Sequence, residues 1–388
     1  MKQMTSKERL LAAIKFQGPD RVPVSPRMWR YLLKQEGSMK HDVYIRYAAS
    51  HGLDPLLCTY LCTKLIPDSD FKNTDLKDVS VSATWEKVPD GTVLARTFET
   101  PAGTLKDRTI IPTAGGEFGI APNPHIAEHL VKGPEDLDAL QYVVDACVAR
   151  MPGVIDYKAR SAEIGGNGLL AAGIYSCLSH NAGDAYAIEN FMVDCLVRPD
   201  FIHRLLDIFH RPILARLKQG LEAGAEMVYC STFFESMSSG WSPAIYREFF
   251  IPRLKEQVDL AHEYGVLYHH YDDGKVRESL PMIKKMGADL VSTICPPPSG
   301  DVTPGQAREI AGEDLCLNGG IDTVNLIWRG TPEAIDRAVK EAIEQAALPE
   351  GGYIVGSSDS ISEEVTPENF DALFSAVLKY GQTKAACC

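Results

Sequence analysis

The chain contains no long hydrophobic run, and this absence excludes the simplest kinds of membrane protein. A transmembrane helix needs about 18 or more consecutive apolar residues, and no stretch of the 388-residue sequence approaches that length. The N-terminal residues lead into an amphipathic helical pattern and lack the apolar core of a signal peptide. We therefore expect no membrane association and a cytoplasmic location.

A surplus of basic residues is also missing. Lys and Arg together number 39 and Asp and Glu number 52, which gives a net charge of −13 at pH 7. Nucleic acids and anionic membranes favour basic surfaces, so general binding of either is not expected. Hydrophobic residues make up 45% of the chain, which is enough to form a full core.

Closely spaced cysteine pairs are absent, although the chain has ten cysteines. No CxxC pair occurs, and only Cys387 and Cys388 lie closer than four positions apart, so a zinc ribbon is not expected. Many of the cysteines lie in apolar segments, as reduced core cysteines do. This distribution is typical of a protein from a reducing cytoplasm.

A GxGxxG phosphate-binding fingerprint after a first strand is missing as well. The glycine-rich run Gly165–Gly168 does not supply it, because that run precedes a predicted strand and the fingerprint has to follow one. Apolar strand-like runs instead alternate with helical patterns over most of the chain. This alternation predicts the α/β class and a single (β/α)8 TIM barrel formed by residues 1–388. The eight predicted strands are Arg21–Val24, Pro55–Leu61, Gly168–Ile174, Glu226–Thr232, Val266–His270, Asp289–Thr293, Leu315–Gly319 and Tyr353–Gly356.

One region breaks the alternation of strands and helices. Residues 80–111 contain three β-rich runs separated by Pro-Asp-Gly and Pro-Ala-Gly turns, which predicts an antiparallel β-meander. We interpret residues 65–130 as an insertion near the mouth of the barrel. It could serve as a lid, as a partner-docking surface or as structural decoration.

The most informative segment is Val266–Gly274, an apolar, Tyr-rich run that ends in two histidines and two aspartates. In a β/α barrel the catalytic groups lie at the C-terminal ends of the strands, so this tip predicts an active site. Adjacent strand residues point to opposite faces, so only one of His269 and His270 can face the barrel interior. The predicted catalytic residues, for substrate positioning or proton transfer, are Tyr271, Asp272 and Asp273.

Five phrases of the sequence resemble the uroporphyrinogen decarboxylase superfamily, and the pattern spans about residues 5–381. The superfamily contains porphyrinogen decarboxylases and cobamide-dependent methyltransferases, so the resemblance implies a TIM-barrel enzyme without deciding between the two. The phrases are Thr5–Ile14, Asp20–Val24, Ser242–Pro252, Leu317–Asp322 and Pro367–Ala372.

Two features favour the methyltransferase branch: a missing decarboxylase motif and a phrase in the meander. The true decarboxylases carry Arg-Gln-Ala-Gly-Arg soon after the first strand, and Pro26–Tyr31 does not match that motif. Arg27 and Arg30 could still bind carboxylates. The meander phrase Thr100–Leu105 is more similar to the methyltransferases.

The resemblance also implies a metal site. Thiol-methylating members bind zinc through His-x-Cys and a later cysteine, but this chain has Tyr271–Gly274 and Gly356–Ser358 at those places. Members that demethylate methyl ethers use two acids and a histidine, a pattern similar to Glu235, Glu248 and His269. Zinc on such ligands would act as a Lewis acid on the departing phenolate.

The resulting hypothesis is a zinc-dependent methyltransferase of the O-demethylase type. It would move a methyl group from a small methylated donor, with an aryl methyl ether preferred, to the Co(I) of a corrinoid. The chain has no Asp-x-His-x-x-Gly cobalamin module, so the corrinoid would be carried by a separate protein. The candidate substrate-binding residues are Arg27, Arg30, His180, Asn181, His270 and Asn318.

Two alternatives and one question stay open. A metal-independent decarboxylase of a carboxylated aromatic or tetrapyrrole would use Arg27 or Arg30 for carboxylates and Asp272 or Asp273 for protons. A barrel that binds a corrinoid or small ligand without turnover would not need the acids and histidine. The sequence also leaves open whether the protein is a homodimer.

Overall fold

The computed structural model describes residues 3–62, 65–67, 74–76, 78–89, 91–113, 124–174, 178–232 and 235–382. The chain divides into two compact units. The first consists of Met1–Leu61, Val154–Ile174 and Leu217–Cys388, and the second of Cys62–Gly153 and Tyr175–Arg216. The second unit therefore extends beyond the predicted 65–130 insertion and includes a later segment. That the two units form a single domain stays a prediction.

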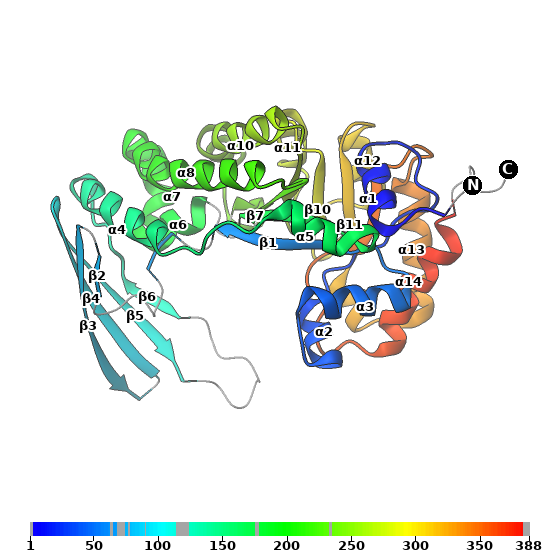
Figure 1. Ribbon diagram of the computed structural model, residues 1–388, viewed down its shortest axis with the longest axis horizontal. Coiled ribbons are helices and arrows are strands. Elements are labelled where there is room, and N and C mark those ends of the chain that lie inside the picture. The colour runs from blue at the N-terminus through cyan, green and yellow to red at the C-terminus, as the bar shows by residue number, and fades with distance from the viewer. Residues whose placement is uncertain are drawn as a thin grey trace. The chain divides into compact units, whose positions relative to one another are not determined.

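A seven-stranded parallel sheet organises the first unit (Figure 1). Its strands follow chain order, and each coincides with a predicted strand to within about two residues. Several of them are buried along their whole length, as is usual for parallel strands covered on both faces. The order is β1 (Leu56–Cys62), β7 (Leu169–Ile174), β8 (Met227–Ser231), β9 (Leu267–Tyr271), β10 (Leu290–Ile294), β11 (Cys316–Ile321) and β12 (Tyr353–Ser357).

The predicted first strand, Arg21–Val24, is not a strand. Val24 forms one parallel bridge with Val355 of β12, and its carbonyl accepts a hydrogen bond from the Asp54 N–H at 2.8 Å. Pro23 has no N–H to donate, so a regular ladder cannot form here. The segment thus contacts β12 on one side and the residues before β1 on the other, and a closed barrel of eight strands stays a prediction.

Helices cover the sheet, and several begin at a Thr or Ser cap followed by proline. Thr331 and Thr366 each precede a proline and accept a hydrogen bond from the backbone N–H three residues later. Thr5 and Glu8 form a capping box at the start of α1. The helices of the first unit are α1 (Ser6–Ile14), α2 (Trp29–Glu36), α3 (His41–His51), α5 (Tyr157–Ile164), α9 (Pro243–Ile245), α10 (Ile251–Glu263), α11 (Leu280–Met286), α12 (Pro304–Ala311), α13 (Pro332–Ala346) and α14 (Pro367–Tyr380), with the short helical turns η2 (Gly165–Asn167), η4 (Met237–Ser239), η5 (Tyr246–Phe250) and η6 (Thr323–Trp328).

Helix α1 covers the N-terminal ends of the strands. Its Leu10, Ala13 and Ile14 are buried in one cluster with the first residues of several strands, among them Leu169 and Leu290. Arg9 and Arg21 surround the fully buried Asp54 at the same end, with closest N–O distances of 2.6 and 2.8 Å. The centre of this end of the sheet is therefore packed and ion-paired. The C-terminal ends are where enzymes of this architecture place their active sites.

The second unit contains the predicted meander, enlarged to five antiparallel strands. The turn from β3 to β4 ends at Gly91, which has φ of +159°, and a Cβ there would lie 2.2 Å from the Ile111 carbonyl oxygen. Arg96 and Asp107 pair across β4 and β5 and are both buried. The elements are β2 (Thr74–Leu76), β3 (Val79–Val88), β4 (Gly91–Thr100), β5 (Gly103–Pro112), β6 (His125–Glu128), η1 (Pro134–Asp136), α4 (Leu137–Ala149), α6 (Leu178–Tyr186), α7 (Ile188–Val197) and α8 (Pro199–Glu222), whose last turns belong to the first unit.

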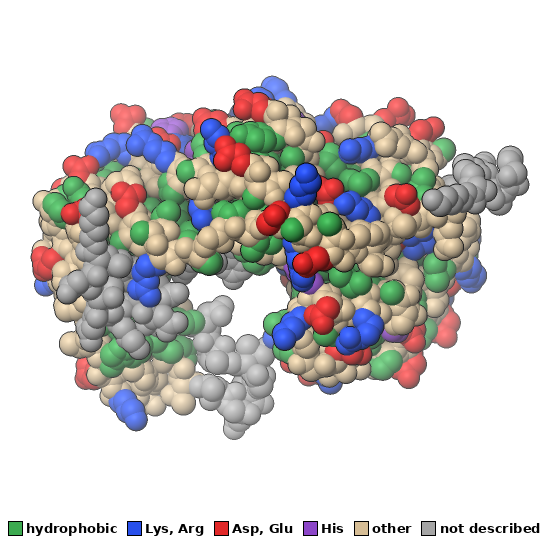
Figure 2. Space-filling view, viewed as in Figure 1, with side chains coloured by type: hydrophobic (Ala, Val, Ile, Leu, Met, Phe, Trp, Pro, Cys, Tyr) green, Lys and Arg blue, Asp and Glu red, His purple; other side chains and the backbone are tan. Residues whose placement is uncertain are grey.

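The surface carries both signs of charge. Figure 2 shows acidic and basic side chains interspersed over the visible face, with no extended basic area among the described residues. None of the described helices combines the length and the apolar character that crossing a membrane would require.

Candidate functional site

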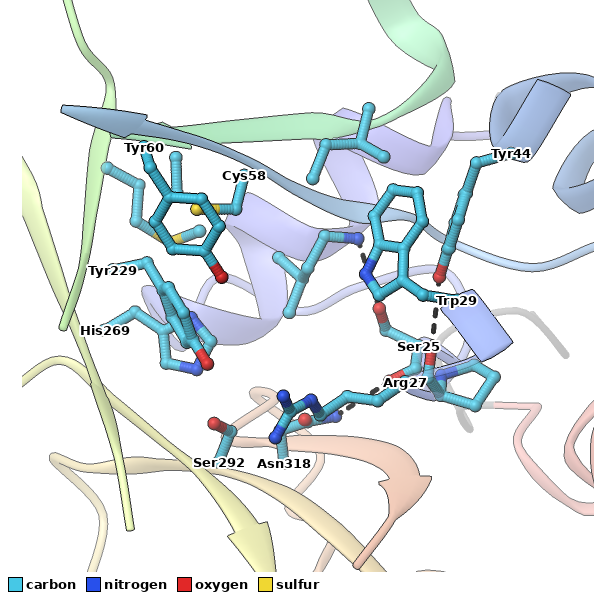
Figure 3. A pocket seen from close by; sticks show the side chains of 15 residues that line it. Ser25, Arg27, Trp29, Tyr44, Cys58, Tyr60, Tyr229, His269, Ser292 and Asn318 are labelled. Atoms are coloured by element: carbon cyan, nitrogen blue, oxygen red, sulfur yellow. Dashed lines mark hydrogen bonds between the residues drawn. The ribbon is translucent and has the colours of Figure 1, made fainter. Parts of the chain in front are cut away.

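A cavity in the first unit is lined by residues of six sheet strands, of the segment after Val24 and of helices α2 and α3 (Figure 3). About 100 Å³ of it is open to water-sized spheres. One water needs roughly 10–15 Å³ by this measure, so the cavity holds on the order of seven to ten waters or one small molecule. Its lining is Ser25, Pro26, Arg27, Trp29, Tyr44, Leu56, Leu57, Cys58, Tyr60, Ala171, Met227, Tyr229, His269, Ser292 and Asn318.

His269 lies in the cavity wall because it is an inward position of β9. It pairs in register with Tyr229 of β8, and the two rings meet edge to face with centroids 4.9 Å apart. Its Nε2 is buried and has no hydrogen-bond partner among the described residues. Burial, together with the nearby His270 and Arg27, lowers the pKa of His269 to about 3, so the imidazole is neutral at neutral pH. A buried ring nitrogen without a partner is a position where a ligand would bind.

His270 faces the other way, as the alternation of strand residues requires. Its Nε2 lies 3.2 Å from Thr232 Oγ1 and 3.5 Å from the Tyr246 hydroxyl, both away from the cavity lining. Burial lowers the pKa of this histidine to about 3 as well. His270 therefore belongs to the polar layer between β9 and the helices, and the structure does not bring it to the cavity.

A charged network lies beside the cavity and joins three of the predicted residues. The guanidinium of Arg27 lies over the Tyr271 ring, 4.5 Å from its centroid, and Nη1 is 3.4 Å from Asp359 Oδ1. The Tyr271 hydroxyl donates to Asp273 Oδ2 at 3.1 Å. Burial raises the pKa of Tyr271 well above its usual range and also raises that of Asp273, so the phenol stays protonated at neutral pH.

Asp272 is directed away from the cavity. It accepts hydrogen bonds from the Ser279 hydroxyl at 2.5 Å and from the Asp273 N–H at 2.9 Å, and its side chain is buried. Burial raises its pKa to about 8. The catalytic role predicted for Asp272 stays a prediction, and this placement does not favour it.

The raised pKa of Asp272 predicts a pH-dependent stability. The folded state holds this proton up to about pH 8, whereas the unfolded carboxyl releases it near pH 4, so stability falls as pH rises between these values. Asp272→Asn removes this loss and can keep both hydrogen bonds. We measure the urea midpoint of the variant minus that of the unchanged protein, and we expect this difference to be larger at pH 8 than at pH 5. The same offset at both pH values would contradict this prediction, and Asp259→Asn, at an exposed ion pair, is the control.

The three predicted zinc ligands do not come together. Glu248 is exposed on η5, in a helical segment where Pro252 removes a backbone donor and the turn widens. Glu235 is buried, near the Cys230 and Tyr246 side chains on the helix side of the sheet, whereas His269 lines the cavity. Within the described ranges no three His, Cys, Asp or Glu side chains are grouped as metal ligands. Among the described residues, Glu235, Glu248 and His269 do not form a site for a zinc ion, and the zinc site stays a prediction that this placement does not favour.

The predicted substrate-binding residues are divided. Arg27 and Asn318 line the cavity, and the Asn318 amide donates to the Ile354 carbonyl at 3.2 Å. Arg30 is exposed on α2. His180 and Asn181 belong to α6 of the second unit, where Asn181 accepts a hydrogen bond from the Leu65 N–H at 2.9 Å.

Sequence reasoning missed Tyr60, Tyr229 and Ser292, which also line the cavity. Tyr229 and Ser292 are inward residues of fully buried strands, where an apolar run does not show which face is which. The sequence carries no direct signal for them, because the register between neighbouring strands is visible only in the structure. There Tyr229 is the direct partner of His269, which identifies the inward positions of β8 once β9 is assigned.

A model of a protein family described as uroporphyrinogen decarboxylase (URO-D) matches residues 108–380. A uroporphyrinogen decarboxylase of Myxococcus xanthus is 29% identical over 184 residues, which is 47% of this chain and about half (49%) of that protein. One from Aromatoleum aromaticum is 26% identical over 300 residues, 76% of each chain. A methylated-thiol–coenzyme M methyltransferase of Methanosarcina mazei is 28% identical over 195 residues, 49% of this chain and 48% of that protein.

The fold is similar to that of a solved structure, a methyltransferase from Methanosarcina mazei. The TM-score is 0.60, and the match covers 97% of this chain and 99% of the other. The sequence identity is 16%, so this likeness supports the architecture alone.

Proposed function

Since the chain belongs to the uroporphyrinogen decarboxylase (URO-D) family, whose members are enzymes, we propose that it is a corrinoid-dependent methyltransferase. It would take a methyl group from a small methylated compound and pass it to the Co(I) of a corrinoid carried by a separate protein. Similarity to a methylated-thiol–coenzyme M methyltransferase supports methyl transfer in general. The corrinoid protein and a cytoplasmic location remain expectations from the sequence, and the oligomeric state remains open.

The size and lining of the cavity carry the proposal. About 100 Å³ suits a single ring with its substituents better than the four rings of a tetrapyrrole. Four polar groups converge on one region, as is usual in small-molecule sites. These are Arg27, His269, Ser292 and Asn318, and the lining also includes Ser25, Tyr44, Tyr60 and Tyr229.

An aryl methyl ether is the preferred donor because aromatic side chains line opposite sides of the cavity. Figure 3 shows Tyr60 and Tyr229 near His269 and, across the cavity, Trp29 with Tyr44. Flat aromatic ligands gain from edge and face contacts with such rings. The Nε2 of His269 could donate a hydrogen bond to the ether oxygen in one tautomer, without a change in its charge.

A panel of donors tests this proposal. With reduced corrinoid as acceptor, single-ring methoxyarenes should give methyl transfer, and fused three-ring methoxyarenes should not because they exceed the cavity. The measurement is the absorbance change on methylation of cobalt. Equal rates for both groups, or transfer from no donor in the presence of a verified active acceptor, would contradict it.

Decarboxylation is the second candidate, and several relatives named uroporphyrinogen decarboxylase favour it. Arg27 would hold a carboxylate, and Asp273 would handle a proton. Release of carbon dioxide from a carboxylated aromatic or tetrapyrrole, without corrinoid, would favour this function over methyl transfer.

A further inference from the structure

Arg27 gives the cavity a permanent positive charge. It is the only Lys or Arg among the described residues of the lining, and arginine stays protonated throughout the physiological pH range. In Figure 3 its side chain extends toward Ser292 and Asn318, at the side of the cavity where His269 also lies. A ligand group close to these residues would therefore meet a cation.

The backbone around Arg27 is fixed, which keeps the side chain in place. Its N–H donates to Ser357 Oγ at 3.0 Å, and its carbonyl accepts from the Ile361 N–H at 2.7 Å. The Tyr271 ring supports the guanidinium from one face. An arginine held by backbone bonds and by a ring on one side loses little entropy when a ligand binds.

The charge of Arg27 is only weakly neutralised by the protein. Among the described residues, Asp359 is the one acid within ion-pair distance, at 3.4 Å, and its side chain is 61% exposed. Asp273, the other nearby acid, instead accepts from the Tyr271 hydroxyl. An exposed, long ion pair contributes little, so most of the attraction of the guanidinium is available to a ligand.

An ether oxygen bound between His269 and Arg27 would become negatively charged beside this cation as the methyl group leaves. Among the described residues no three His, Cys, Asp or Glu side chains are grouped as metal ligands. Resting on the proposed function, we propose that Arg27 is a catalytic residue that binds the departing aryl oxide, so that the transfer needs no zinc. The guanidinium would form a charge-assisted hydrogen bond that strengthens as the oxygen becomes an anion. It would perform electrostatically the task for which the sequence predicted a metal.

The step balances without a further reactant. The bond between the methyl carbon and oxygen breaks, and both of its electrons remain on oxygen. The two electrons for the new bond to the methyl carbon come from Co(I), which becomes Co(III). Arg27 keeps its proton throughout, and the aryl oxide is protonated by water after release.

Binding of the leaving group tests the inference without any turnover. The probe is 4-nitrophenol, whose ionisation is visible in its absorbance, and 4-nitroanisole is its neutral counterpart. In the full chain we expect the anion to bind about tenfold or more tightly than the ether, so that the pKa of the bound phenol falls. Arg27→Gln should abolish this preference, Arg27→Lys should keep part of it, and Arg160→Gln, at a surface ion pair, should not change it. Equal binding of anion and ether, or an unchanged preference in Arg27→Gln, would overturn the inference.

The rate of methyl transfer provides a second test of the role of Arg27. Across methyl ethers of phenols with increasing pKa, Arg27→Gln should lose roughly 10²–10³-fold in kcat, and more for the poorer leaving groups. A uniform loss over the series would indicate a structural role and overturn the inference, as would activity that follows zinc content after chelation. If no donor methylates cobalt, the proposed function fails, and the binding arm still decides the role of Arg27.

Discussion

His269→Ala is expected to lower kcat/KM for methyl transfer by about 100-fold or more, because it removes the polar ring nitrogen that lines the cavity. His269→Gln retains an amide and should recover part of the loss. Burial lowers the pKa of His269 to about 3. In the unchanged enzyme, ionisation of this residue should therefore cause no change in kcat/KM between pH 5 and pH 8. Steady-state kinetics over this range measure both effects.

Tyr268→Phe is the matched control, because it changes the neighbouring residue on the opposite face of β9. It removes the hydroxyl that donates to Gln257 at 3.0 Å and leaves the cavity lining intact. We expect activity within about threefold of normal and a stability loss of about 1 kcal/mol. An equal loss of activity in both variants would mean that the His269 effect is structural.

Asp54→Ala is expected to lower the free energy of unfolding of the first unit by about 3–5 kcal/mol. The fully buried carboxylate accepts from Arg9, from Arg21 and from the Val24 N–H at 3.0 Å. Its removal leaves two guanidinium groups without this partner, and it frees the segment that contacts both β12 and the start of β1. Arg9 also pairs with Asp20, whose carboxyl is partly exposed, and that pair compensates in part.

Chemical denaturation, followed by far-UV circular dichroism and by tryptophan fluorescence, measures this loss. Asp259→Ala is the control, since its pair with Lys255 is about half exposed on both sides and should contribute less than about 0.5 kcal/mol. A loss below about 1 kcal/mol in Asp54→Ala would show that the buried ion pairs are not a main source of stability.

The arrangement of strands was predictable because buried parallel strands are continuous apolar runs. Seven of the eight predicted segments form the sheet. The exception, Arg21–Val24, has an apolar pattern, but Pro23 interrupts the ladder. The later segment of the second unit, Tyr175–Arg216, could not be assigned from the sequence, because helical periodicity does not show which compact unit a helix joins.

The site was predictable only in part. The alternation along β9 predicted that one histidine faces inward, and the register with Tyr229 identifies it as His269. The spacing of Glu248 from His269 matched a family pattern, but the widened turn of η5 leaves Glu248 exposed while its neighbours Phe249 and Phe250 are buried. Sequence spacing fixes neither the rotation of a helix about its axis nor the side of the sheet that an acid such as Glu235 reaches.

The most direct test of the proposed activity follows the methyl group itself. A methoxyarene labelled with ¹³C in its methyl group is incubated with the enzyme and a reduced corrinoid, and the label is followed by NMR. We predict that the ¹³C signal moves from oxygen to cobalt in stoichiometric amount and that the demethylated phenol is released. Retention of the label on oxygen with every donor, while carbon dioxide is released from a carboxylated aromatic or tetrapyrrole, would contradict methyl transfer and establish the chain as a decarboxylase.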